Sequence, residues 1–166
     1  MKHIFRVESP EGDIYQVTLS SGVDAFFATK DVCNGLSDEF EIIEIDLDRI
    51  SGNHSTTPYT LSLIAKGIGD YFLQNNKAIL YYYCDDMSDV PMSERKQDMW
   101  PQEYRSQLFS LMLRRYVITH SIFDMIDEDV MLLQDIRPIY MHLIGRAEHK
   151  HFIEKVKEYI ITNYGK

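Results

Sequence analysis

The feature that most constrains the fold is an unbroken apolar run, Ala78–Cys84, which stops abruptly at two aspartates. The run shows no alternation of apolar and polar residues, which is typical of a strand covered on both faces. Such a strand belongs in the centre of a sheet that carries helices. Its acidic end, at Asp85, Asp86 and Asp89, is where α/β proteins tend to place binding or catalytic groups.

The chain before this run predicts three strands and a helix. The first twenty residues alternate as two strands around Ser9–Gly12, whose proline and glycine positions suit a type I turn. Phe40–Asp48 alternates again and predicts a half-buried strand. Thr57 and Pro58 then predict a helix start, because threonine caps helices and proline is tolerated at the first helical position.

Two glycines interrupt this helix, which otherwise keeps its apolar spacing from Leu61 to Phe72. Each of Gly67 and Gly69 should cost about 1 kcal/mol relative to alanine. We therefore expect either a close approach of the helix to the sheet or a weaker helical turn.

The chain after the run predicts a helix from Pro101 to about His120, strands over 129–134 and 136–144, and a helix over 148–163. The predicted buried stripe of the first of these helices comprises Tyr104, Leu108, Leu111 and Met112. The complete order is strand–strand–strand–helix–strand–helix–strand–strand–helix. This order predicts an α+β fold with a mixed, mainly antiparallel sheet, in a single domain over residues 1–166.

Composition narrows the range of partners and compartments. The net charge of −9 disfavours nucleic acid, which is itself an anion. No apolar run approaches the roughly 18 residues needed to cross a bilayer, and the amino terminus does not resemble a signal peptide. We expect a cytoplasmic protein that does not enter the membrane.

The acidic cluster offers one chemical hypothesis. Asp85, Asp86 and Asp89 could hold Mg²⁺ or Mn²⁺, with Arg105 on a phosphate, which would make a metal-dependent phosphoesterase or nuclease. No carboxylate motif on a later element supports it, so we expect no bound metal. Aspartates in loops more often cap turns or pair with arginines on the next helix. Glu44, Asp46 and Asp48 also alternate along one strand, and we interpret them as its solvent-facing side.

Other reactive residues form no complete catalytic set. Cys84 could act as a nucleophile with His120 or His142, but a cysteine within an apolar strand is typically inert. His149 and His151 have the wrong helical spacing to share a metal. The sequence contains no phosphate-binding loop and no metal motif, so we expect no cofactor.

The leading hypothesis is therefore a non-catalytic protein-interaction or regulatory domain. Met99 and Trp100 lie in a polar loop, where such residues can form an adaptable contact with another protein or with a second copy. A third hypothesis is a small-molecule sensor with a pocket at the end of the Ile79–Cys84 strand.

Three segments resemble a family of small bacterial proteins known only as a domain of unknown function. They are Ile14–Val17, the strand Ile79–Asp85 followed by Asp89, Arg105 and Leu108-Phe109, and Ile139–Arg146. The chain departs from that family in its long loop from Val90 to Pro101. The resemblance implies an intracellular bacterial protein without an established activity, and it supplies no catalytic residue.

Overall fold

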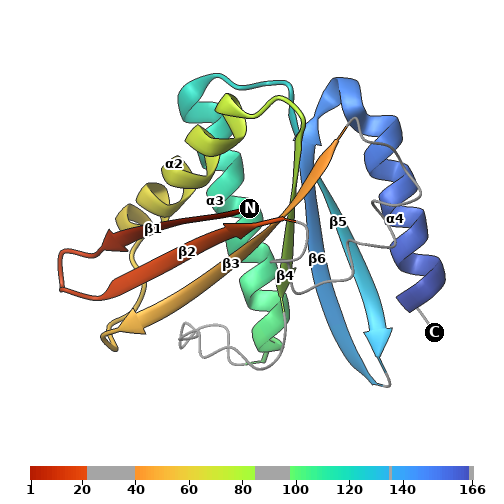
Figure 1. Ribbon diagram of the computed structural model, residues 1–166. Helices are drawn as coiled ribbons and strands as arrows, with labels where there is room; N and C mark the ends of the chain where they lie inside the picture. Colours follow the sequence, from red (N-terminus) through yellow and green to blue (C-terminus); the bar gives the residue numbers. More distant parts are fainter. Residues whose placement is uncertain (22–39, 85–97, 135, 165–166) are drawn as a thin grey trace.

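The computed structural model describes residues 1–21, 40–84, 98–134 and 136–164 of the chain (Figure 1). Its elements, in chain order, are β1 (Lys2–Glu8), β2 (Ile14–Ser20), β3 (Glu41–Ser51), α2 (Pro58–Gln74), β4 (Ala78–Cys84), α3 (Pro101–His120), β5 (Met125–Gln134), β6 (Arg137–Arg146), the 3₁₀ turn η3 (Ala147–His149) and α4 (Lys150–Tyr164). The strands form one sheet in the order β1-β2-β3-β4-β6-β5. Of these neighbours only β3 and β4 are parallel. The predicted α+β class and the predicted order of elements are confirmed.

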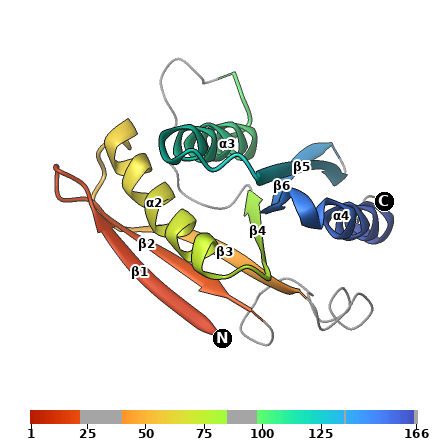
Figure 2. The same cartoon turned by 90° about the horizontal axis from the view of Figure 1, so that it is seen from above.

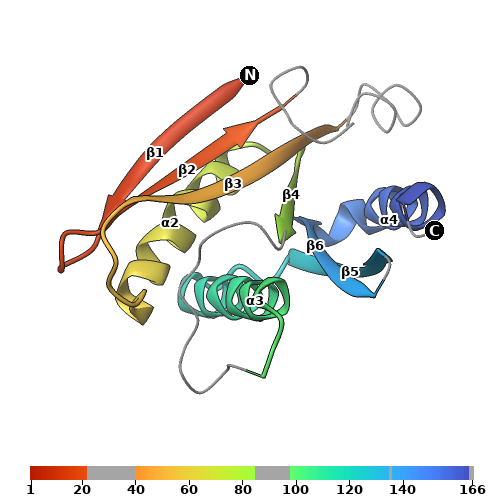
Figure 3. The same ribbon diagram turned by 90° about the horizontal axis from the view of Figure 1, so that it is seen from below.

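The apolar run forms the strand β4, which lies between β3 and β6. Its side chains serve both faces of the sheet, since Leu80 and Tyr82 pack in one apolar cluster whereas Ile79 and Tyr81 pack in another. Helices α2 and α3 cover the first face, and α4 covers the second, over β5 and β6 (Figures 2 and 3). The absence of alternation therefore reflects burial on both sides, as predicted.

Both glycines of α2 mark close approaches. A Cβ built on Gly67 would lie 2.3 Å from the ring of Phe5 in β1, and one on Gly69 would lie 2.1 Å from the ring of Tyr116 in α3. The prediction of a close approach to the sheet holds for Gly67. Gly69 serves the packing of α2 against α3 instead.

The buried face of α3 differs from the predicted one. Leu111, placed in the buried stripe, is 44% exposed. The residues that α3 buries are Gln102, Arg105, Ser106, Phe109, Met112, Leu113 and Tyr116. Apolar residues occur all around this helix, so their spacing could not single out a face, and the buried face carries polar side chains that bind the sheet. Of the predicted stripe, only Met112 is fully buried.

β3 and β5 extend beyond their predicted ends. β3 continues past Asp48 to Ser51, because the residues after Asp48 still pair with β2. β5 begins at Met125 rather than at residue 129, because its first residues already pair with β6. In both places polar residues interrupt the alternation from which strands are predicted. The strand continues there because its backbone pairs with the neighbouring strand. The solvent-facing interpretation of the β3 carboxylates is confirmed for Asp46 and Asp48, which are exposed.

Among the described helices, none is both long enough and apolar enough to cross a membrane.

Candidate ligand-binding pocket

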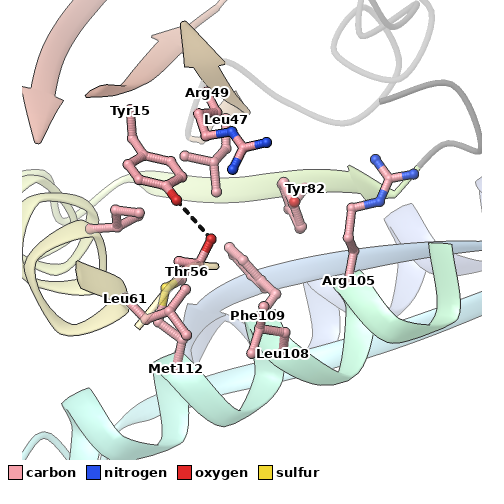
Figure 4. A pocket seen from close by; sticks show the side chains of 11 residues that line it. Tyr15, Leu47, Arg49, Thr56, Leu61, Tyr82, Arg105, Leu108, Phe109 and Met112 are labelled. Carbon is pink, nitrogen blue, oxygen red and sulfur yellow. Dashed lines mark hydrogen bonds between the residues drawn. The ribbon is translucent and has the colours of Figure 1, made fainter. Parts of the chain in front are cut away.

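A small apolar pocket lies where the parallel strands β3 and β4 end, between the sheet and helices α2 and α3 (Figure 4). It encloses about 50 Å³. Among the described residues, its lining comprises Tyr15, Leu47, Arg49, Thr56, Leu61, Ile64, Tyr82, Arg105, Leu108, Phe109 and Met112. The carboxyl end of parallel strands is a common ligand site in sheets covered by helices.

Strand alternation explains how the sheet supplies its part of the pocket. Ile43, Ile45 and Leu47 face the helices along β3, and Arg49 takes the next position in the same alternation. Tyr15 lies opposite Arg49 on the neighbouring strand β2. An arginine therefore occupies the last inward position of a strand whose other inward positions are apolar.

Helix α3 supplies the opposite wall. Arg105, Phe109 and Met112 follow one another at helical spacing on its buried face. The ring of Phe109 stacks on that of Tyr82 with centroids 4.1 Å apart, which fixes the floor of the pocket. Arg105 is only 5% exposed although it is a permanent cation. Two guanidinium groups thus border the pocket, one from β3 and one from α3 (Figure 4).

Hydrogen bonds hold the segment that follows β3, whose Thr56 lines the pocket. The Tyr15 hydroxyl and the Thr56 hydroxyl lie 2.7 Å apart. Arg49 donates from Nη1 to the His54 carbonyl at 2.8 Å. Asp13, which is buried, accepts from the His54 backbone N–H at 3.0 Å and bonds the ring Nδ1 at 2.9 Å. The bond with the His54 ring lowers the pKa of Asp13 and outweighs the raising effect of its burial.

The arrangement suits recognition of an organic anion. Apolar side chains form most of the walls, and guanidinium groups bind carboxylates through paired, charge-assisted hydrogen bonds. Within the described residues, no three His, Cys, Asp or Glu side chains are placed to share a metal ion.

The residues singled out from the sequence have different outcomes. Arg105 belongs to the pocket, whereas Trp100 precedes α3 and is 45% exposed. Asp85, Asp86 and Asp89 lie outside the described residues, so their proposed metal site stays a prediction. Met99 and Trp100 likewise stay a predicted contact surface.

The sequence analysis interpreted Cys84 correctly but did not identify the pocket residue Arg49. Cys84 is fully buried, which agrees with its interpretation as a packing residue. Arg49 was missed because the strand was predicted to end at Asp48. The signal was present, since Arg49 continues the spacing of Ile45 and Leu47.

A hydrogen-bonded Ser–His–Asp array joins α3 to the sheet, and sequence reasoning missed it too. Ser106 Oγ lies 2.8 Å from His142 Nε2, and His142 Nδ1 lies 2.9 Å from Asp127 Oδ1. The three residues come from α3, β6 and β5, and nothing in their spacing along the chain links them.

This array does not meet the needs of nucleophilic catalysis. His142 is 0% exposed, so its ring cannot pass a proton to a leaving group. Ser106 sits inside a helix, where its backbone N–H belongs to the helical ladder rather than to an oxyanion hole. We assign the array to structure: it satisfies the polar atoms of a buried histidine.

Comparison of the chain with protein-family models, with curated proteins and with solved structures finds no match in any of the three. The resemblance to the bacterial family therefore stays a prediction, and the function of the pocket has to be argued from its own chemistry.

Proposed function

We propose that this chain is a regulatory domain that binds a small amphipathic carboxylate in the pocket between β3, β4, α2 and α3. One observation carries the proposal: Arg49 and Arg105 border an otherwise largely apolar pocket from opposite walls. The pocket also matches the expected position of a small-molecule site near the end of the apolar strand, since Tyr82 of β4 lines it.

Arg49 is the side chain best suited to meet the ligand. Within the described part of the chain it donates one hydrogen bond, to the His54 carbonyl. A guanidinium has five N–H donors, so Arg49 has further donors that can bind a carboxylate. A hydrogen bond to a charged group contributes about 1.5–3 kcal/mol, and the apolar walls favour an alkyl body over water.

The pocket volume limits the ligand size. A cavity must offer roughly 10–15 Å³ to hold one water molecule, and this pocket encloses about 50 Å³. The pocket therefore has room for a few water-sized groups, which suits a carboxylate with a short alkyl chain.

Isothermal titration with butanoate tests the proposal, with butanamide as a neutral ligand of the same shape. We expect saturable binding of butanoate and roughly tenfold weaker binding of butanamide, because the amide lacks the charge that a guanidinium recognises. Equal affinities for the two, or no saturable binding of butanoate, would contradict the proposal.

Arg49→Gln supplies the matched variant. It should lower the affinity for butanoate at least tenfold and leave that for butanamide within a factor of two. Arg6→Gln is the control, since Arg6 is an exposed arginine on β1 that bonds Gln16 and lies outside the pocket. An equal effect of both substitutions would show that overall charge, not the pocket, attracts the anion.

A second candidate function is association with a second copy of the chain. β5 is the last strand in the described sheet order, and its Met131 and Leu133 are each 57% exposed. An edge strand with apolar side chains favours pairing with another strand. Light scattering over a concentration series tests this: we expect a dimer that Met131→Lys dissociates, and a strict monomer would exclude it.

A further inference from the structure

A second cavity adjoins the pocket. It lies between α2 and α3 and encloses about 90 Å³. It shares three lining residues with the first pocket, namely Leu61, Leu108 and Met112. Among the described residues, these three aliphatic side chains therefore border both spaces.

The wall formed by these residues can be displaced. Leu61 and Leu108 are half-buried, and methionine is unbranched with several rotatable bonds, so it adapts its shape readily. The two helices also meet elsewhere, where Tyr116 packs on Gly69. Moving Leu61 or Met112 therefore need not disturb the contact that keeps the helices together.

We infer that the ligand is an unbranched monocarboxylate of medium chain length. This inference rests on the proposed function. The carboxylate binds beside Arg49 and Arg105, and the alkyl chain passes Met112 into the second cavity. A narrow space between two helices accepts a linear chain more readily than a branched or cyclic body.

The geometry of α3 sets the chain length. From Arg105 to Met112 the helix rises about 10 Å at 1.5 Å per residue. An extended chain of about eight carbons spans that distance, given C–C bonds near 1.5 Å and a zigzag path. Butanoate therefore stays in the first pocket, and octanoate reaches the second.

Titration with butanoate, hexanoate, octanoate and decanoate tests the inference. Each buried methylene should tighten binding about threefold to fourfold, so octanoate should bind far more tightly than butanoate. Octanamide serves as the neutral control and should bind at least tenfold more weakly than octanoate.

Ser62→Phe blocks the second cavity without touching the first. Ser62 is an exposed residue of α2 that lines only the second of these two cavities. The substitution should reduce the affinity for octanoate at least tenfold and leave the affinity for butanoate unchanged. Leu73→Phe is the control, since Leu73 is exposed on the same helix and lies outside both cavities.

The outcomes separate the two proposals. If butanoate binds and depends on Arg49 but octanoate binds no more tightly, the chain-length inference is overturned and the proposed function stands. If octanoate binds tightly and Ser62→Phe has no effect, the alkyl chain lies elsewhere and the inference is likewise overturned. If no carboxylate binds, the proposed function itself is wrong.

Discussion

At the scale of single residues, Asp13 ties the start of β2 to the segment after β3, whose Thr56 lines the pocket. Its carboxylate is buried and bonds both the backbone and the ring of His54. The carboxylate also touches Gly52, whose positive φ of 92° turns the chain at the end of β3. Two predictions follow from this contact.

The first prediction concerns pH. Because the pKa of Asp13 is lowered from its ordinary 3.8 in the folded protein, the unfolded state takes up the proton first as the pH falls. The stabilisation is therefore complete above about pH 5 and is lost as the pH falls through the lowered pKa. Asp13→Asn keeps the shape but removes the titration. We expect the difference in unfolding midpoint between the two proteins to shrink as the pH falls below about 5, and a constant difference would contradict this account.

The second prediction compares two glycines. Gly52 and Gly12 both have positive φ, but a Cβ would collide with Asp13 only at Gly52, 1.7 Å from its Oδ1. Gly12→Ala should destabilise by about 1–2 kcal/mol through backbone strain alone. Gly52→Ala should cost at least 1 kcal/mol more, because Asp13 must also move and weaken its bonds to His54. Urea unfolding measures both, and equal losses would refute the contact.

At the scale of secondary structure, α3 is held to the sheet by polar bonds as well as by apolar packing. Gln102 donates to the Pro138 carbonyl at 2.9 Å, and Ser106 meets His142. These bonds explain why the buried face of α3 could not be identified from its apolar residues. The helix start at Pro101 was predictable, because proline suits a first helical position whatever the helix packs against.

The third prediction tests the array that anchors α3. Ser106→Ala leaves a nitrogen of the buried His142 ring without its partner, which should cost about 1–3 kcal/mol in the free energy of unfolding. Ser110→Ala is the matched control, because Ser110 also bonds Asp127 but at a more exposed position. It should cost less than about 0.5 kcal/mol. A loss no larger for Ser106→Ala than for the control would refute the anchoring role.

At the scale of the whole molecule, the pocket joins elements from both halves of the chain. β2 and β3 provide one wall, and α3 provides another. A ligand bound there bridges these elements only in the folded state. Binding must then stabilise the entire fold by mass action.

The fourth prediction follows from this linkage. Octanoate at a hundred times its dissociation constant should raise the free energy of unfolding by about 2.7 kcal/mol. For a chain of this size the melting temperature should rise by roughly 5–10 °C. At the same octanoate concentration Arg49→Gln should lose about half of this rise or more, whereas Arg6→Gln should keep it. A similar rise in both variants would place the binding site elsewhere.

The amino-acid sequence by itself determined the order of elements and the central position of β4. These properties follow from local patterns: the period of apolar residues, the threonine and proline that begin α2, and a run too apolar to face solvent. Such patterns act between neighbours in the chain and need no knowledge of the fold.

Only the tertiary structure decided which distant residues meet. Arg49 and Arg105 line one pocket because β3 pairs in parallel with β4 while α3 packs over β4 and β6. His142 meets Ser106 because β6 inserts between β4 and β5. The period of apolar residues predicts which face of a strand or helix a side chain lies on. Which element packs against that face depends on the order of the strands and the packing of the helices, and these are properties of the whole chain.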